Sequence, residues 1–333
     1  MELTERQVDA LLSKLSLLKT EIQKVIVGQD VILDELIVAL LAGGHCLLEG
    51  VPGLAKTLMV RTMSQALDLS FRRIQFTPDL MPTDIVGTEI LEEDHATGKR
   101  FFKFNHGPIF ANIILADEIN RTPPKTQSAL LEAMQEFEVT YGGKTYALEK
   151  PFFILATQNP IEQAGTYPLP EAQLDRFLLY VRIGYPSATE EKDIISNTTG
   201  NQKVDVRPVL GGGEIKQLQS FVRDISISED LVQYVTSVIR ATRPETSNVA
   251  FVKEWVRWGS GPRAGQALVL TAKARALLKG RFAVTLDDIQ TMAYPVLRHR
   301  ILVNFKAEAE NISSDDVTAS LLKEVERPKG RLE

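Results

Sequence analysis

The sequence contains a single cysteine, Cys46, among its 333 residues. One cysteine can form neither an intrachain disulfide nor a zinc site built on several cysteines. Such scarcity is typical of proteins from reducing compartments, so we expect a cytoplasmic protein. The histidines are scattered and none pairs with another four residues away, so we expect no histidine-based metal site.

Long apolar runs are also absent. The longest apolar stretch, residues 36–48, is interrupted by Gly43, Gly44 and His45 and is too short to cross a bilayer. The first residues are charged and lack the apolar core and cleavage site of a secretory signal. We therefore expect no membrane span.

The chain has no excess of positive charge, because 38 Lys and Arg residues face 43 Asp and Glu residues. Binding nucleic acid requires a basic surface, so we expect no nucleic-acid partner, although a local basic patch is compatible with this balance. The apolar fraction of 44% is enough for sizeable cores. The length predicts about two domains.

Short apolar runs alternate with helical patterns in the first half of the chain. Unbroken runs such as residues 113–116 indicate strands that are buried on both faces. The alternation predicts an α/β fold, a parallel sheet with helices on both faces, preceded by a helix over residues 4–26. The expected strands are His45–Glu49, Phe71–Phe76, Asn112–Asp117, Phe152–Thr157 and Leu178–Ile183.

Two hairpins interrupt this pattern. Val139–Tyr141 and Lys144–Tyr146 flank Gly142-Gly143, which is a two-residue turn signal. Residues 85–91 and 100–104 flank a polar turn over residues 92–99. Neither hairpin fits inside a parallel sheet, so we predict two inserts, near residues 85–104 and 139–146.

The pattern changes after Pro186. Ser187 with Glu190 and Thr285 with Asp288 form capping boxes that open helices, and further helices are expected near residues 214, 228 and 261. We therefore predict an α/β domain over residues 1–186 and an all-α domain over residues 187–333. Trp255 and Trp258, three residues apart on an expected helix, are interpreted as core residues.

The strongest chemical signal is a phosphate-binding loop between a strand and a helix. Such a loop points backbone N–H groups at phosphates, and the helix N-terminus adds its dipole. Lys56 is expected to reach the β- and γ-phosphates, and the Thr57 hydroxyl to bind Mg²⁺. Ala55 replaces the usual glycine before the lysine, which predicts a negative φ there. The loop residues are Gly50, Val51, Pro52, Gly53, Leu54, Ala55, Lys56, Thr57 and Leu58.

A pair of acids follows the apolar run 113–116. Asp117 is expected to hold the Mg²⁺ shell through water, and Glu118 to orient and polarise the attacking water. An apolar strand that ends in two acids is common by itself, and a solvated strand end explains it equally well. After a phosphate loop, the pair is far more specific.

Three single residues are weaker candidates. Asn159 follows the strand 152–157 and is placed to lie between the γ-phosphate and the water, although Asn-Pro is also ordinary turn chemistry. Arg176 is a candidate arginine finger, and a surface ion pair is the alternative. Arg263 starts a helix in the second half and is placed to reach the γ-phosphate across the domain cleft; an ordinary first-turn arginine is the alternative.

In their order along the chain, these motifs resemble the AAA+ ATPases, and within that class the sequence is similar to the MoxR family. Alanine before the loop lysine is itself familiar in that family. The resemblance covers about residues 20–325 and is carried by 27–30, 48–57, 75–84, 107–110, 116–121, 156–160 and 165–177.

The resemblance implies roles for individual residues. Asn159 matches sensor 1, Arg176 the arginine finger and Arg263 sensor 2. Val27, Gly28 and Gln29 match the segment that packs near adenine, and the hairpins fall where this branch carries its inserts. Arg121, just after the acid pair, is a second arginine that is able to face a neighbouring subunit.

The resulting hypothesis is a Mg-ATP-hydrolysing AAA+ module that works as a hexameric ring. The resemblance implies a chaperone-like machine that remodels or matures protein substrates, often with a partner that carries a von Willebrand factor A domain. One alternative is the ATPase subunit of a magnesium or cobalt chelatase. Another, from a different class, is a nucleotide-bound scaffold or a DNA-acting motor, which the acidic pI and the complete set of hydrolytic residues disfavour.

Overall fold

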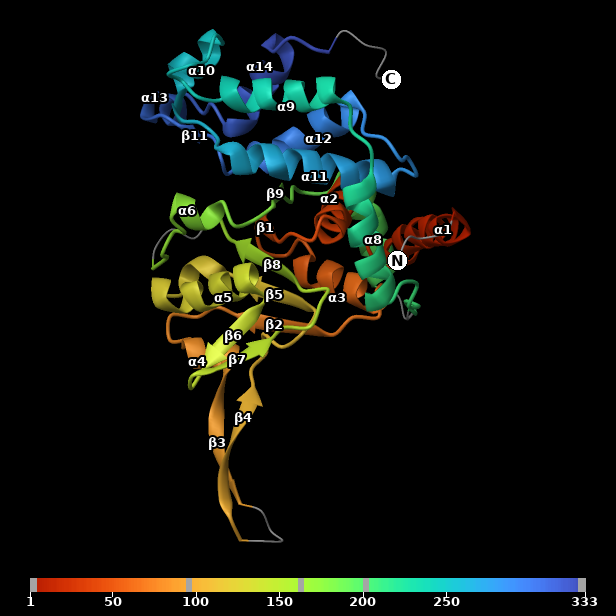
Figure 1. Cartoon of the computed structure of the whole chain (residues 1–333), viewed down its shortest axis with the longest axis vertical. Coiled ribbons are helices and arrows are strands. Elements are labelled where there is room, and N and C mark those ends of the chain that lie inside the picture. The colour runs from red at the N-terminus through yellow and green to blue at the C-terminus, as the bar shows by residue number, and fades with distance from the viewer. Residues whose placement is uncertain (1–4, 94–97, 161–164, 200–203, 329–333) are drawn as a thin grey trace.

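The computed structural model describes residues 5–93, 98–160, 165–199 and 204–328. Its centre is a five-stranded sheet in which every pairing is parallel (Figure 1). This arrangement confirms the predicted α/β class and the five expected strands, with bounds shifted by one residue or so. In spatial order the strands are β2 (Phe71–Gln75), β5 (Ile113–Asp117), β8 (Phe153–Gln158), β1 (Cys46–Glu49) and β9 (Leu179–Arg182).

Helices cover both faces of the sheet because successive strand residues point to opposite sides. On β1, Cys46 and Leu48 belong to one core and Leu47 to the other. The first core is shared with α1 (Glu5–Gln23), α2 (Asp30–Leu41) and α3 (Lys56–Ala66). The second is shared with α4 (Pro82–Val86) and α5 (Pro124–Glu136).

His45 is a buried histidine that ties α5 to the sheet. Its Nε2 lies 3.1 Å from the carbonyl oxygen of Met134, and its Nδ1 accepts from the backbone N–H of Ile154 at 3.1 Å. A second proton on Nδ1 would face the Ile154 N–H group, so the site requires a neutral ring. Burial lowers the pKa of His45 to about 4, although the bond to Met134 opposes the shift.

We expect this site to weaken the fold in acid. The folded pKa lies below the unfolded value, so the contribution is full above pH 6.5 and is lost as the pH falls toward 4. Between pH 7.5 and 5 the loss is about 2 kcal/mol, from 1.36 kcal/mol per pKa unit. Glu35, whose pKa burial raises to about 7, has a pH dependence of the opposite sign.

A His45→Gln variant isolates the histidine from these other groups. Its amide carries both a donor and an acceptor and does not titrate. Urea unfolding of both proteins at pH 7.5 and pH 5 is the measurement, and the variant should lose about 2 kcal/mol less than the wild type. An identical pH dependence in the two proteins would show that His45 is not held neutral.

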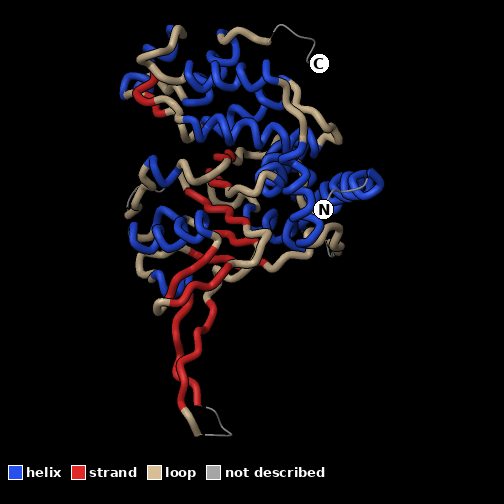
Figure 2. The backbone as a smooth tube through the Cα atoms, viewed as in Figure 1, coloured by secondary structure: helices blue, strands red, loops and turns tan. Residues whose placement is uncertain are grey.

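The first hairpin forms an arm that projects from the body of the molecule (Figure 2). It pairs β3 (Gly87–Glu93) with β4 (Arg100–His106), and the tip of its expected turn, residues 94–97, lies outside the described residues. The predicted first strand began too early, because Ile85 and Val86 belong to α4. Ile85 is buried in the second core, and its helical position in α4 follows from that burial.

The second hairpin agrees with its prediction. β6 (Glu138–Tyr141) pairs with β7 (Lys144–Ala147), and both glycines of the turn have positive φ. The two hairpins touch near their bases, where the rings of Phe104 and Tyr146 stack with centroids 4.3 Å apart.

The second half is largely helical, and its predicted helix starts hold. Ser187, Ser228 and Thr285 each cap a helix by accepting from a backbone N–H. The sequence analysis did not find α13 and α14, and it expected the helix at Trp255 to continue through Trp258. The helices are α7 (Ala188–Thr198), α8 (Gly212–Asp224), α9 (Glu229–Ala241), α10 (Ala250–Trp255), α11 (Pro262–Leu278), α12 (Leu286–Leu297), α13 (Phe305–Ala309) and α14 (Ser314–Glu324).

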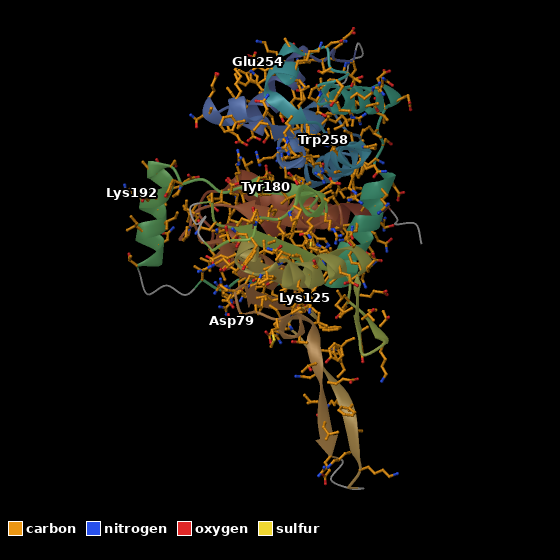
Figure 3. All side chains as sticks on the ribbon, turned by 90° about the vertical axis from the view of Figure 1, so that its left-hand side faces the viewer. Asp79, Lys125, Tyr180, Lys192, Glu254 and Trp258 are labelled. Carbon is orange, nitrogen blue, oxygen red and sulfur yellow. The ribbon has the colours of Figure 1, made fainter. Side chains whose placement is uncertain are left out.

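This half is not entirely α-helical. β10 (Val256–Trp258) pairs antiparallel with β11 (Leu302–Val303), so the prediction of an all-α domain needs that correction. The interpretation of both tryptophans as core on one helix is also wrong. The helix α10 ends at Trp255, which is buried, whereas Trp258 is 66% exposed on the strand that follows (Figure 3).

The helical half packs against the sheet edge formed by β9. α12 contacts β9, α11 and α8 both contact α2, and one continuous hydrophobic core runs through these elements. The boundary near Pro186 therefore separates two kinds of structure that share a core, and as a domain limit it stays a prediction. None of the helices in the described part of the chain has the length and apolarity that crossing a bilayer requires.

Candidate functional site

The phosphate loop lies where predicted, between the end of β1 and the start of α3. Gly53 has a φ of 90°, a backbone conformation that is strained for any residue with a side chain. Lys56 opens α3, and its Nζ donates to the carbonyl oxygen of Gly50 at 2.6 Å. Burial lowers the pKa of Lys56, whereas the nearby carboxylates of Asp117 and Glu118 raise it. The lysine thus faces both its own loop and the acid pair.

The expectation of a negative φ at Ala55 is wrong. Ala55 has φ 54° and ψ 23°, the left-handed region, immediately before α3. For a residue with a Cβ this conformation costs roughly 1–2 kcal/mol. The buried strand and helix on either side of the loop hold the residue there, so the turn geometry overrides the local preference.

The acid pair ends β5 in a hydrogen-bonded network. Asp117 accepts from the Thr157 hydroxyl at 2.6 Å and forms an ion pair with Arg73 at 2.6 Å. Glu118 accepts from Gln75 Nε2 at 3.0 Å and from Arg121 Nη1 at 2.8 Å. Its backbone is also left-handed, with φ 59°. The network fixes both carboxylates at the carboxyl end of the sheet.

Three members of this network were not found from the sequence: Arg73, Gln75 and Thr157. Thr157 is fully buried, and its hydroxyl bridges the two acids, because it donates to Asp117 and accepts from the Glu118 N–H at 2.8 Å. Arg73 and Gln75 are two residues apart on β2, so their side chains share one face of the strand. β2 pairs with β5 in parallel register. The strand β2 has three polar residues among its five, and this polarity was the available signal.

Asn159 follows β8 directly and is 6% exposed. Because β5, β8 and β1 are neighbours in one parallel sheet, their carboxyl ends meet at one edge. The structure therefore places the phosphate loop, the acid pair and Asn159 at the same edge, as the sequence predicted. Their catalytic roles stay predictions.

The candidate adenine segment, Val27–Gln29, connects α1 to α2. Gly28 has φ 68° and lies so close to the Glu190 side chain on α7 that a Cβ would overlap it. Gln29 is also left-handed, and its Oε1 is buried with no hydrogen-bond partner in the described part of the chain. An orphaned buried acceptor suits the amino group of a bound base.

The donor set fits Mg²⁺ bound together with a nucleotide. Thr57, the second residue of α3, offers a hydroxyl and Asp117 a carboxylate, and Mg²⁺ prefers such oxygen ligands completed by water and phosphates. No cluster of three or more His, Cys, Asp or Glu residues suited to a metal occurs in the residues that the structure describes.

The three arginines have distinct partners. Arg176, between α6 (Glu171–Leu174) and β9, donates from Nη1 to the carbonyl oxygen of Leu131 at 3.0 Å. Arg263, at the start of α11, forms an ion pair with Asp175 at 3.2 Å. Arg121 bonds Glu118 of its own chain. The structure thus links Arg263 to the residue before Arg176, which the sequence did not predict.

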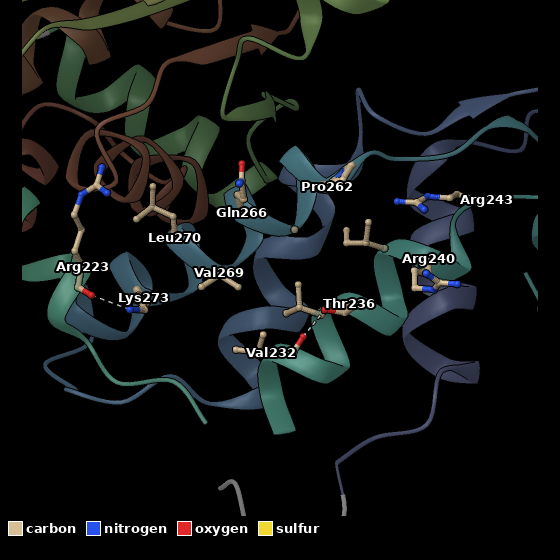
Figure 4. Close-up of a pocket in the computed structure, with 13 residues that line it drawn as sticks. Arg223, Val232, Thr236, Arg240, Arg243, Pro262, Gln266, Val269, Leu270 and Lys273 are labelled. Atoms are coloured by element: carbon tan, nitrogen blue, oxygen red, sulfur yellow. Dashed lines mark hydrogen bonds between the residues drawn. The ribbon is translucent and has the colours of Figure 1, made fainter. Parts of the chain in front are cut away.

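A separate cavity of about 860 Å³ lies in the helical half, between α9 and α11 (Figure 4). Its lining combines apolar residues such as Val232 and Val269 with cations such as Arg240 and Lys273. None of the predicted nucleotide-binding residues lines it. This cavity is therefore distinct from the candidate nucleotide site.

Comparisons with known proteins agree with this fold. Residues 45–179 match the family described as "ATPase family associated with various cellular activities (AAA)", and residues 250–321 match an "AAA lid domain". The chain is 45% identical to Chaperone MoxR1 of Mycobacterium tuberculosis, over 93% of this chain and 81% of that protein. It is 43% identical to the uncharacterized protein YeaC of Bacillus subtilis, over 93% of each.

A solved structure extends the likeness to the whole fold. The crystal structure of a putative ATPase from Cytophaga hutchinsonii superposes with a TM-score of 0.89 at 41% identity, over 97% of both chains. The parallel sheet, the phosphate loop and the helical lid define an α/β P-loop ATPase of the AAA+ class. The chain belongs to the MoxR family of AAA+ ATPases.

Proposed function

We propose that this protein hydrolyses ATP with Mg²⁺ at the edge where β5, β8 and β1 end. The observation that carries the proposal is the meeting of Lys56, the acid pair and Asn159 at that edge. Phosphoryl transfer depends on positioning and charge stabilisation, with little covalent chemistry for the protein to supply. A cation, two acids and an amide around one phosphate site meet those needs.

Each residue has a defined task in this proposal. Lys56 leaves the Gly50 carbonyl and neutralises the β- and γ-phosphates. Thr57 and Asp117 hold Mg²⁺, Asp117 through water, and the metal supplies charge neutralisation. Glu118 polarises the attacking water, and Asn159 orients it against the γ-phosphate. Val27, Gly28 and Gln29 pack against adenine, with the free Gln29 Oε1 as acceptor.

Arg176 completes the site of a neighbouring subunit, so the active form is an assembly, a hexameric ring by family resemblance. The Arg176 guanidinium donates to the carbonyl oxygen of Leu131, an uncharged partner, so its charge is available for a phosphate. Arg263 forms an ion pair with Asp175, the residue before Arg176. In this proposal Arg263 therefore lies at the subunit interface together with the segment that carries Arg176. Heterologous contacts of this kind close into rings when the rotation permits.

The output is remodelling or maturation of protein substrates, with a partner that carries a von Willebrand factor A domain. The name of the relative Chaperone MoxR1 supports a chaperone-like role. The β3–β4 arm supports a contact with a partner, because Leu91 and Phe102 are 55% and 70% exposed on it. The cytoplasmic location expected from the single cysteine stays a prediction.

The direct test is metal-dependent phosphate release. The purified chain should release phosphate from ATP with Mg²⁺ and stop when EDTA is added. Thr57→Ala should lose most turnover because the hydroxyl is gone, whereas Thr57→Ser should retain it. Duplex DNA should leave the rate of phosphate release of both variants unchanged, because an acidic chain binds nucleic acid poorly. Equal turnover of the alanine and serine variants, or turnover in EDTA, would contradict the proposed site.

A further inference from the structure

Three consecutive residues after α12 cover the outer edge of the sheet: Arg298, His299 and Arg300. Arg298 Nη1 donates to the carbonyl oxygen of Tyr180 on β9, and His299 Nε2 lies 3.0 Å from that of Phe177. An uncovered edge strand leaves unpaired carbonyls. Side chains from a single turn of the helical lid thus provide hydrogen-bond partners for carbonyl oxygens at this edge of the α/β domain.

Arg300 makes the most contacts of the three. Its Nε lies 2.7 Å from Asp175 Oδ1, and its Nη2 donates to the carbonyl oxygens of Phe177 at 2.8 Å and Asp175 at 3.4 Å. Its Nη1 bonds the carbonyl oxygens of Leu178 at 3.1 Å and Val296 at 2.6 Å. The guanidinium therefore joins the end of α12 to the chain segment 175–178.

The Arg300 side chain is 4% exposed, so its charge is held inside the protein. Burial lowers the pKa of Arg300, and the Asp175 carboxylate raises it. Asp175 is shared, because its other oxygen binds Arg263 from the start of α11. Two lid arginines thus hold one carboxylate of the α/β domain, and the buried one sets its position.

The segment that Arg300 holds is the one that carries Arg176. Arg300 bonds the backbone carbonyls of Asp175 and Phe177, the residues on either side of Arg176. The Asp175 carbonyl belongs to the peptide unit that precedes Arg176 and the Phe177 carbonyl to the unit after Phe177, so these bonds hold the chain on both sides of Arg176. Any movement of the end of α12 relative to β9 must therefore be passed to Arg176 through these bonds.

We propose that Arg300 is a positioning residue for hydrolysis in the neighbouring subunit, holding Arg176 in the orientation in which it reaches that subunit's ATP. The inference rests on the proposed function of Arg176. Under this inference the helical lid influences hydrolysis in the neighbouring subunit, in addition to packing against the α/β domain of its own subunit. Arg300 itself touches no nucleotide.

Arg300→Lys is the variant of choice, because lysine keeps the charge but cannot bond Asp175 and two carbonyls in one plane. We expect unchanged ATP affinity and turnover lower by roughly tenfold to a hundredfold, the loss typical of small misplacements. The matched control is Arg298→Lys. Arg298 covers Tyr180 and pairs with Asp315 at 2.9 Å, and it contacts neither neighbour of Arg176. Its turnover should stay near that of the wild type.

Mixed assemblies separate positioning from general damage. Arg300→Lys subunits keep an intact phosphate loop, and Lys56→Ala subunits keep an intact Arg176 held by Arg300. Mixed after proven subunit exchange, the two should recover turnover, because the Lys56→Ala subunit serves its neighbour's site. A mixture of Arg300→Lys with Arg176→Ala should recover none, since neither supplies a placed arginine.

The outcomes distinguish this inference from the function on which it rests. Recovery of Arg176→Ala with Lys56→Ala but not of Arg300→Lys with Lys56→Ala would show that Arg300 supports its own subunit's site, and would overturn the inference alone. Full activity of Arg176→Ala would overturn the assignment of Arg176 and this inference together. If Arg300→Lys fails to fold, Asp175→Asn, which weakens the same bond, replaces it with the same expected results.

Discussion

A Glu118→Gln variant should bind ATP as tightly as the wild type and release almost no phosphate. The amide has the size of the carboxylate, so it fills the same position beside Gln75 and Arg121. It carries no charge to polarise water, and loss of such a base typically lowers rates by roughly 10²–10⁴. Lys56→Ala should lose tight binding itself, because it removes the cation that faces the phosphates.

Fluorescent ATP-analogue binding and phosphate release, measured on the same preparations, test this pair. Glu93→Gln on the β3–β4 arm is the control, because it removes one carboxylate outside the candidate site, from a side chain that is 51% exposed. Its binding and turnover should match the wild type. The assigned roles would be wrong if Lys56→Ala and Glu118→Gln lost ATP affinity to the same extent.

The sheet was predictable because its strands are buried on both faces and appear as unbroken apolar runs. Ile113–Ala116 is one such run, and all four residues are fully buried. The helix starts were predictable because a cap is a local device. Ser187 bonds a backbone N–H only three residues away. Signals of this kind need no knowledge of the rest of the fold.

The errors arose where distant contacts decide the local conformation. Ile85 was assigned to a strand by its apolar neighbours, but burial against the second core places it in a helix. Ala55 was expected to avoid positive φ, yet the elements around the loop impose it. Trp258 looked like a helical neighbour of Trp255, but α10 ends at Trp255 and the chain continues as a strand.

The candidate site divides in the same way. Lys56 closes the loop after β1, Asp117 ends β5 and Asn159 follows β8, so the sequence places all three at the carboxyl edge of a parallel sheet. Thr157 and Arg300 act through partners in other elements, and no local pattern marks them. Arg300 lies 125 residues from Asp175 in the chain, and only the packing of α12 against β9 brings them together.

Arg176→Ala should bind ATP normally and be nearly inactive. Arginine fingers contribute roughly 10³–10⁵ in rate, which corresponds to about 4–7 kcal/mol of barrier. In this chain Arg176 donates to the Leu131 carbonyl, so its removal leaves no buried charge without a partner. A finger that acts between subunits requires assembly, so under this proposal turnover per subunit in the wild type should also rise with protein concentration.

Mixing Arg176→Ala with Lys56→Ala gives the sharper result. Each protein alone is inactive, but the first keeps its phosphate loop and the second keeps its arginine, so an interface that joins them should recover partial turnover. Fluorescence energy transfer between labelled subunits verifies their exchange. Arg121 is the competing candidate, although it bonds Glu118 within its own chain at 2.8 Å. If subunits exchange and only the Arg121→Ala mixture recovers, Arg121 is the finger and the assignment of Arg176 is wrong.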